Sequence, residues 1–250
     1  MKSNDLDIAY GTRAVIEAIK SGKAIERLLI QKGLSNSLIS ELRSEIKGQD
    51  IPISYVPLEK LNRIKKGNHQ GVIAYLSVID YPKLENIVMQ VFESGKTPFF
   101  LILDRITDVR NFGAIARTAE CAGVQAIIVP DKGSALITSD AIKTSAGALH
   151  HIHVCKEKSL KNTIHYLKDS GIEVIACTEK TEDTVFEADF VSPTCVVLGS
   201  EENGISEDIL AACDQKVKIP MSGKIDSLNV SVAAGIVLFQ ISAKNKSLIT

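Results

Sequence analysis

The sequence predicts a two-part α/β protein whose larger, C-terminal part contains a parallel β-sheet. From residue 99 onward, apolar runs without in–out alternation alternate with amphipathic segments, the pattern of strands buried on both faces and covered by helices. Residues 1–78 show a shorter alternation of the same kind, and a break follows near Asp80. We therefore expect a small α/β domain over residues 1–78, a linker over 79–98 and a larger domain over 99–250.

In the first part, apolar spacing predicts a helix that ends at Gly22 and buries Val15, Ile16 and Ile19. Strands are predicted at 26–31, 53–56 and 71–78, a helix at 37–48, and a short helix opened by Pro57 before the last strand. The stretch RIKKGNHQG, residues 63–71, is basic and turn-prone and precedes the last of these strands.

In the second part, continuous apolar runs predict strands at 99–104, 125–130, 151–155, 173–177, 195–199 and 217–220. Helical spacing predicts helices at 112–123, 139–146, 159–171, 205–213 and 227–242. The segment 84–95, inside the predicted linker, is also amphipathic. Since ligands of parallel sheets bind at the carboxyl ends of the strands, the loops there are the first places to look for a site.

Composition excludes several classes of protein. The start of the chain lacks the apolar core of a secretory signal, and no apolar run approaches the ~20 residues of a membrane helix. Five cysteines without a C-x-x-C pair indicate reduced thiols in a cytoplasmic protein. Residues 1–78 hold twelve Lys/Arg against eight Asp/Glu, a net charge of +4, and the rest hold seventeen against twenty-two, −5. The first part is thus the half suited to an anionic partner.

Three loops after predicted buried strands carry unusual polar residues: DRITDVRNFGAIARTA (104–119), LGSEENGIS (198–206) and IPMSGKIDSLNVS (219–231). Each also has a structural interpretation. Asn111 could be a helix cap, Gly113 a packing glycine and Arg117 a solvated helix residue, while the other two loops could be glycine turns and a Ser/Asn cap. It is the joint occurrence of the three loops that favours a functional site.

Other chemistries find little support. There is no G-x-G-x-x-G after a strand and no phosphate-binding loop, which favours a ligand without phosphates, held by backbone groups and apolar walls. His150, His151 and His153 lack nearby acidic or cysteine ligands at metal spacing, so we expect no metal site. The G-x-S-x-G elbow of serine hydrolases is also missing.

The stretch KKGNHQG could contact RNA. Lys65 and Lys66 suit phosphates, and Asn68, His69 and Gln70 suit hydrogen bonds to RNA, although an ordinary polar loop explains the same residues. Aromatic residues make up only 5% of the chain and Trp is absent, so we expect recognition by backbone, shape and the 2′-hydroxyl rather than by base stacking.

Taken together, LDRITDVRNFGAIARTAECAGV, VVLGSEENGIS and IPMSGKIDSLNVSVAAG resemble, in order and spacing, the three motifs of the SPOUT superfamily of RNA methyltransferases, TrmH-type 2′-O-ribose branch. YGTRAVIEAI and NHQGVIA resemble the extra RNA-binding domain of the ribosomal-RNA members, which has an L30e-like fold. Within the branch, the 23S rRNA guanosine 2′-O-methyltransferases are the most similar. One departure is Val109, where the family usually has proline.

The resemblance implies a deep trefoil knot in the C-terminal α/β domain, S-adenosylmethionine as methyl donor, and a homodimer whose active site draws on both subunits. The residues that it implies for catalysis are Arg117, Glu201, Asn111, Ser227 and Asn229. Those that it implies for the cofactor are Leu198, Gly199, Ile219, Met221 and Leu228.

Within that scheme, a guanidinium is a poor proton acceptor, so we assign Arg117 to orienting a phosphate and stabilising alkoxide charge, with Glu201 paired with it directly or through water. Two alternatives remain open: a tRNA ribose methyltransferase of the same branch, and a catalytically silent RNA-binding or ribosome-assembly factor.

Overall fold

The computed structural model describes residues 8–49, 51–190 and 193–247. The chain divides into two compact units. The first runs up to Asp80 and includes Leu136–Ser139, and the second comprises Tyr81–Ala135 and the chain from Asp140 onward. The first seven residues of the predicted N-terminal domain lie outside the described ones.

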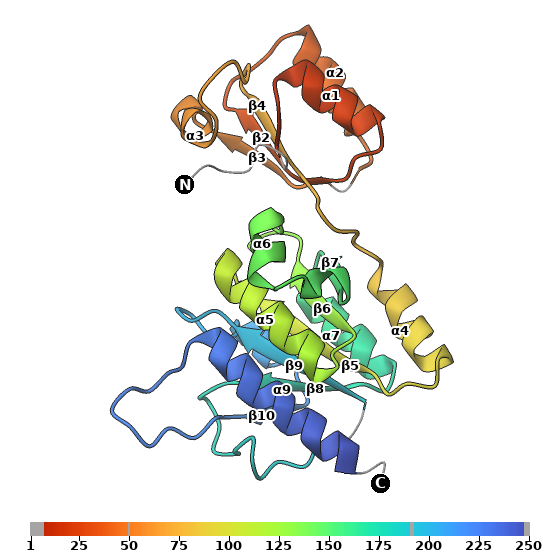
Figure 1. The fold of residues 1–250 in the computed structure, drawn as a ribbon, viewed down its shortest axis with the longest axis vertical. Coiled ribbons are helices and arrows are strands. Elements are labelled where there is room, and N and C mark those ends of the chain that lie inside the picture. Colours follow the sequence, from red (N-terminus) through yellow and green to blue (C-terminus); the bar gives the residue numbers. More distant parts are fainter. Residues whose placement is uncertain (1–7, 50, 191–192, 248–250) are drawn as a thin grey trace. The chain divides into compact units, whose positions relative to one another are not determined.

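The first unit is a four-stranded sheet with helices on both faces (Figure 1). Its elements are β1 Ile8–Tyr10, α1 Thr12–Lys20, β2 Ile25–Gln31, α2 Ser37–Glu45, β3 Ile53–Val56, α3 Leu58–Ile64 and β4 Val72–Leu76. The strand order is β1-β4-β2-β3, with only β2 and β3 parallel. Every element predicted for this part is present. The added strand, β1, is only three residues long and carries no pattern of its own.

Two apolar layers hold this unit together. Side chains of α1 and α2, such as Val15 and Leu42, pack with Leu28 and Ile30 on one face of the sheet. The shorter α3 covers the other face through Leu61, which packs against Leu29, Val56 and Ile73. The successive residues Leu29 and Ile30 therefore point to opposite faces, which explains why this central strand shows no alternation in its sequence.

The second unit contains a six-stranded sheet of order β10-β8-β9-β5-β6-β7, parallel throughout. Its strands are β5 Phe99–Asp104, β6 Ala126–Pro130, β7 His153–Glu157, β8 Glu173–Cys177, β9 Thr194–Gly199 and β10 Gln215–Val217. Its helices are α4 Leu84–Glu93, α5 Val109–Ala122, α6 Ser139–Thr144, η2 Ala148–His150, α7 Leu160–Asp169, α8 Glu207–Leu210 and α9 Val230–Ser247. The expected α/β fold with a parallel sheet is confirmed.

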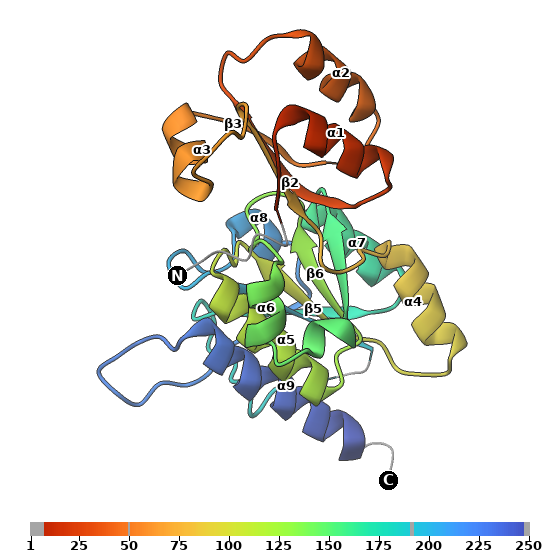
Figure 2. The ribbon, with the colours of Figure 1, turned by 45° about the horizontal axis from the view of Figure 1, so that its top comes forward.

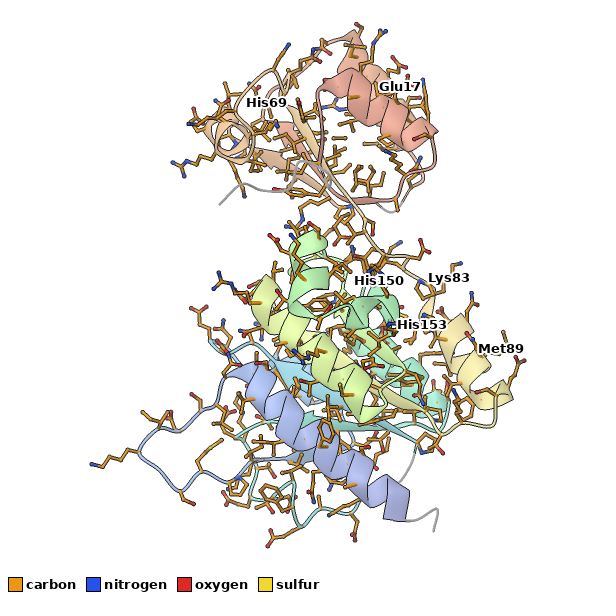
Figure 3. The ribbon with its side chains drawn as sticks, in the orientation of Figure 1. Glu17, His69, Lys83, Met89, His150 and His153 are labelled. Carbon is orange, nitrogen blue, oxygen red and sulfur yellow. The ribbon has the colours of Figure 1, made fainter. Side chains whose placement is uncertain are left out.

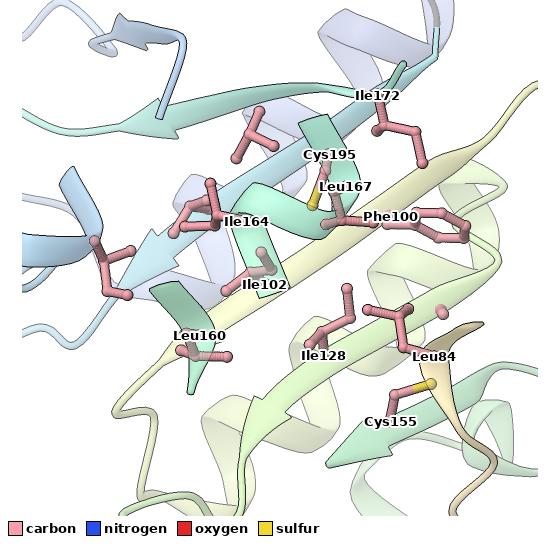
Figure 4. Packing of buried hydrophobic residues seen from close by; sticks show 14 of the residues in the cluster. Leu84, Phe100, Ile102, Ile128, Cys155, Leu160, Ile164, Leu167, Ile172 and Cys195 are labelled. Atoms are coloured by element: carbon pink, nitrogen blue, oxygen red, sulfur yellow. The ribbon is translucent and has the colours of Figure 1, made fainter. Parts of the chain in front are cut away.

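The core of this unit lies between the sheet and α4, α7 and α8, where Phe100 and Ile102 of β5 pack against Leu84, Ile164 and their neighbours (Figure 4). All six residues of β5 are buried, as its unbroken apolar run predicts. On the other face α5 packs against α9, and Figures 1 and 2 show the two helices side by side.

Helix α4 belongs to the second unit. Its side chains Leu84, Ile87, Val88 and Val91 are buried in the core just described. An amphipathic helix next to an uncovered sheet face gains free energy by packing on it. The segment 79–98, predicted as a linker, therefore contributes a helix to the second unit instead of only joining the two.

Within the part of the chain that the structure describes, no helix is both long enough and apolar enough to span a bilayer. Five thiols are present as free cysteines. Burial, together with the nearby carboxylate of Glu157, raises the pKa of Cys155 to about 12, which keeps this core thiol neutral at ordinary pH.

Candidate functional site

The three loops singled out in the sequence begin at the carboxyl ends of parallel strands, on the same side of the sheet. Strands β5, β9 and β10 end at Asp104, Gly199 and Val217, and because all three are parallel, the loops after them start at the same edge. The structure brings the first two of these loops together with the start of α9, the helix that follows the third loop.

Asp104, the last residue of β5, fastens the loop after β9 to the end of β5. Its buried Oδ2 accepts hydrogen bonds from the backbone N of Ser206 (2.8 Å) and from the Ser206 hydroxyl (2.7 Å). Arg105 has a left-handed backbone (φ 60°), and its guanidinium lies 3.4 Å from Asp104 and donates to the Gly204 carbonyl at 3.2 Å. The C-terminal end of the β9 loop is thus fixed to the end of β5.

The β9 loop is itself a tight turn. Ser200 and Gly204 exchange two backbone hydrogen bonds, of 3.2 and 2.8 Å, and Asn203 N donates to the Ser200 hydroxyl at 3.1 Å. A Cβ on Gly199 would lie 2.1–2.2 Å from backbone atoms of Gly204 and Ile205, closer than atoms can approach. Only glycine fits at 199, so the shape of the turn depends on this residue.

Glu201, at the tip of the turn, joins the three loops. Its Oε1 accepts hydrogen bonds from the side-chain amides of Asn111 (3.3 Å) and Asn229 (2.5 Å) and from the backbone N of Val230 (3.1 Å). The amide of Asn229 also donates to Asn111 Oδ1 at 3.0 Å. We call these three side chains the Asn111–Glu201–Asn229 cluster. Since Val230 is the first residue of α9, Glu201 places its negative charge at the positive end of that helix.

The caps of α5 and α9 explain why both asparagines can reach Glu201. Asp108, not Asn111, caps α5 by accepting from Arg110 N and Asn111 N at 2.9 and 2.8 Å, so the alternative interpretation of Asn111 as the cap is wrong. Asn229 precedes α9 and accepts from Ser231 N at 3.0 Å through Oδ1, which leaves its amide group for Glu201 and Asn111. The interpretation of Gly113 as a packing glycine is supported, because a Cβ there would lie 2.6 Å from Thr144.

Residues 219–228 form the third loop, which is open. Within the described residues, none of these ten forms a hydrogen bond, and the chain from Pro220 to Asn229 is exposed. Met221 and Leu228 are 40% and 37% exposed, and Ser227 is exposed as well. Figure 1 shows this connection between β10 and α9 as a wide loop standing away from the sheet. Ser227, Met221 and Leu228 therefore lie outside the cluster.

The other predicted cofactor residues lie on or next to strands. Leu198 is buried at the end of β9, next to Gly199, and Ile219 is half-buried just after β10. Strand β8 lies between these two strands and ends at Cys177. Burial, together with Glu179, raises the pKa of Cys177 to about 12, so this thiol is not a nucleophile near neutral pH.

Arg117 lies apart from the cluster in a single chain. It is exposed on α5 six residues after Asn111, which is about 9 Å along the helix axis and about 120° around it. Among the described residues it forms no hydrogen bond and no ion pair, so a direct pair with Glu201 is not observed. Among the described residues, the Glu201 carboxylate is held by two side-chain amides and forms no ion pair.

Comparison with known proteins decides the family. The model of the SpoU rRNA methylase family matches residues 98–239, which include the cluster. A second model, described as RNA 2′-O ribose methyltransferase substrate binding, matches residues 8–82. The chain belongs to the SpoU rRNA methylase family. The resemblance inferred from the three motifs and the expectation of a methyltransferase are thereby confirmed.

Relatives cover the chain almost end to end. A protein of Bacillus subtilis named as a TrmH family tRNA/rRNA methyltransferase is 34% identical over 97% of both chains. One of Staphylococcus aureus with the same family name is 37% identical over 95% of this chain and 96% of its own. The SpoU methyltransferase AviRb of Streptomyces viridochromogenes, solved in complex with AdoMet, has a TM-score of 0.60 at 23% identity and covers 96% of this chain and 90% of its own. This likeness supports the fold.

Sequence reasoning missed the residues that hold the motif loops in place. Asp104, Arg105, Asp108 and Ser206 were not singled out, although Asp104 is the one charged residue closing an otherwise apolar strand run and Ser206 is followed by two acids that begin a helix. His150, His151 and His153 are exposed, and the described residues contain no group of three or more His, Cys, Asp or Glu placed to hold a metal ion.

Proposed function

We propose that the protein transfers a methyl group from S-adenosylmethionine to a ribose 2′-hydroxyl of RNA, a guanosine of 23S rRNA. The observation that carries this proposal is the Asn111–Glu201–Asn229 cluster, which joins the three motif loops at one edge of the sheet in a chain of the SpoU rRNA methylase family. A tRNA ribose is the second candidate, because relatives are named as tRNA/rRNA methyltransferases.

The residues present fit this cofactor. Residues 219–228 offer backbone N–H and C=O groups without partners in the described chain, and these suit the edge of an adenine. Met221 and Leu228 are exposed and Ile219 is half-buried, so these three offer apolar surface, while Leu198 lies buried next to Gly199 at the end of β9. The sequence has no glycine-rich phosphate-binding motif after a strand. These five residues hold the cofactor in our proposal. When bound, S-adenosylmethionine supplies a methyl group already activated by its sulfonium.

The remaining task of the chain is to position the ribose and accommodate its proton. Glu201 Oε1 is occupied by the cluster and by α9, and Oε2 has no hydrogen-bond partner among the described residues. In our proposal Oε2, with Ser227, faces the ribose hydroxyl, while Asn111 and Asn229 fix the carboxylate. Arg117 orients the adjoining phosphate and stabilises the developing alkoxide, as a guanidinium suits anions better than protons.

In our proposal a homodimer brings a positive charge to the Glu201 carboxylate. Val232, Ile236, Phe239 and Ala243 form an apolar stripe along α9 that is not fully buried, and Val232 and Phe239 are 51% and 50% exposed. We infer that this stripe packs against a second copy of the chain and that Arg117 of the partner subunit completes the site. We also propose that the second unit forms the deep trefoil knot implied by the resemblance, with the open loop folded around the cofactor.

The two units divide the work in this proposal. Residues 1–78, with a net charge of +4, bind the RNA, and residues 99–250 carry out methyl transfer. A cytoplasmic enzyme that acts during rRNA processing fits these roles, since its substrate is RNA and its thiols are free.

The test is transfer of labelled methyl groups from S-adenosylmethionine to rRNA and tRNA taken from cells that lack the gene. We expect alkali-resistant label at one ribose of 23S rRNA, and a loss of about 10²-fold or more for Arg117→Ala with cofactor binding unchanged. Arg110→Ala is the matched control, because Arg110 is exposed on the same side of α5. Label in tRNA instead of rRNA would show that the substrate is a tRNA ribose. Absence of both label and cofactor binding would favour a silent RNA-binding factor.

Mixed dimers test the shared site. Homodimers of either Arg117→Ala or Glu201→Gln are expected to be inactive. In a mixed dimer of the two variants, one site combines the intact Glu201 of one subunit with the intact Arg117 of the other. If the arginine acts across the interface, this site is active. No recovery in mixed dimers of confirmed composition would place Arg117 and Glu201 in the same subunit's site.

A further inference from the structure

The loop between α3 and β4 is held rigidly from inside by His69. This side chain is 4% exposed, and both ring nitrogens have partners: Nδ1 accepts from Gly71 N at 3.0 Å, and Nε2 lies 3.0 Å from Asn62 Oδ1. Because Nδ1 is an acceptor, Nε2 carries the hydrogen and donates to Asn62. Figure 3 labels His69 at this loop, next to α3. The residue that the sequence offered as an RNA contact is therefore an internal support.

The backbone of the loop is fixed as well. Gln70 has a left-handed conformation (φ 52°), which residues with a side chain rarely adopt. Gly71 follows at φ 78°, and a Cβ there would lie 2.7 Å from Leu34 and 2.9 Å from Gln31. Strained backbone persists only where the surrounding fold determines it, and such places concentrate at binding sites. The result is a preorganised loop that keeps Lys66, Asn68 and Gln70 exposed.

This loop lies beside Tyr10 at the end of β1. Gly11 N donates to the Val72 carbonyl at 3.0 Å, and the side chain of Gln70 lies next to Gly11. The ammonium of Lys65 lies over the Tyr10 ring, 4.7 Å from its centroid, and the tyrosine is 40% exposed. The exposed residues of this loop and strand end, with the half-buried Lys65, are called the Tyr10 surface: Tyr10, Lys65, Lys66, Asn68 and Gln70.

The chemistry of the Tyr10 surface suits an unpaired nucleotide. It combines an aromatic ring, two positive charges and two amides. A base stacks on tyrosine, its phosphate pairs with lysine or arginine, and amides bond to base edges, which is how proteins read unpaired RNA. A protein partner is less well matched, because the only large apolar group of the Tyr10 surface is the ring itself.

We propose that the Tyr10 surface binds an unpaired nucleotide of the RNA substrate, with the base stacked on Tyr10 and the phosphate held by Lys66. For its substrate class this inference rests on the proposed function. It replaces the expectation, drawn from the low aromatic content, that base stacking plays no part. One exposed ring in a preorganised place is enough, whatever the average composition.

The test compares variants of the full chain for binding to 23S rRNA and total tRNA over a range of KCl. Tyr10→Leu is expected to weaken binding about tenfold with the salt dependence unchanged, because stacking releases no counterions. Tyr10→Phe keeps the ring and should bind like the unmodified protein. Tyr55→Leu is the matched control, since Tyr55 is 49% exposed on β3, at the opposite edge of the same sheet.

Charge is tested separately. Lys66→Gln should lower the slope of log K against log salt by about 0.7, the value for one phosphate of a single strand, whereas Lys47→Gln, an exposed lysine after α2, should leave it unchanged. The proposed role of the Tyr10 surface would be overturned if Tyr10→Leu and Tyr55→Leu changed RNA affinity equally, or if Tyr10→Leu left it unchanged. This holds even if methyl transfer is found. Tyr10-dependent binding without methyl transfer would retain the surface and remove the proposed activity.

Discussion

The turn after β9 and the loop after β10 begin at the same sheet edge, yet the chain fixes only one of them. The turn over residues 199–206 is held by Asp104, by paired backbone groups and by a glycine that no other residue can replace. The loop over 219–228 forms no hydrogen bond among the described residues and is mostly exposed. In the proposed site, therefore, the fold preorganises the carboxylate and leaves the cofactor-binding segment to be ordered by a ligand or a second subunit.

This difference fits a division between chemistry and binding. A catalytic group gains from rigidity, because a displacement of about 1 Å can cost a hundredfold in rate. A segment that closes around a cofactor must first open to admit it, so such loops come from the least stable parts of a fold.

The largest effect is expected for glycine replaced by alanine in the two regions. Gly199→Ala forces a Cβ into backbone atoms 2.1–2.2 Å away and should lower the free energy of unfolding by about 3 kcal/mol or more. Gly223→Ala, in the open loop, meets nothing closer than 3.9 Å and should change it by about 0.5 kcal/mol or less. Urea denaturation of both variants measures the difference. Similar losses would mean that the open loop is packed in solution.

A smaller effect is expected for the carboxylate that fastens the turn. Asp104→Ala leaves the N–H and hydroxyl of Ser206 without their acceptor, which should cost about 1–3 kcal/mol. Asp226→Ala, an exposed carboxylate in the open loop, should fall within about 0.5 kcal/mol of the unmodified protein. Because the turn carries Glu201, Asp104→Ala should also lower kcat for methyl transfer more than it raises the KM for the cofactor. An equal rise in KM would show that Asp104 supports the cofactor segment instead.

The same contrast marks how far the sequence could predict the structure. Buried strands and amphipathic helices follow from local patterns, so the parallel sheet and its order of elements were predictable. β1 was missed because three residues carry no pattern, and α4 was assigned to a linker because its apolar face does not reveal which sheet it covers. The motif loops identified Asn111, Glu201 and Asn229, and the structure joins these three.

What the sequence could not give is which contacts the fold makes between distant segments. Asp104 bonds to a residue 102 positions away, and the bond of Asn229 to Asn111 spans 118 positions. The role of His69 as an internal support also required the fold, since a histidine in a polar loop is expected to be exposed. Arg117 remains a prediction, because its proposed partner lies on another subunit and no pattern within one chain reveals it.

The smallest effect expected concerns the cofactor and the open loop. S-adenosylmethionine at ten times its Kd should raise the free energy of unfolding by only about 1.4 kcal/mol. Its local effect is expected to be clearer. The amide hydrogens of residues 221–228 should exchange freely without ligand and slowly with it, because their N–H groups gain partners. The amide hydrogens of residues 200–206 should exchange at the same rate in both states. Hydrogen exchange with mass spectrometry separates the two peptides. Slow exchange of 221–228 without ligand would show that dimerisation alone orders this loop, and the contrast between the two regions would then hold only for the single chain.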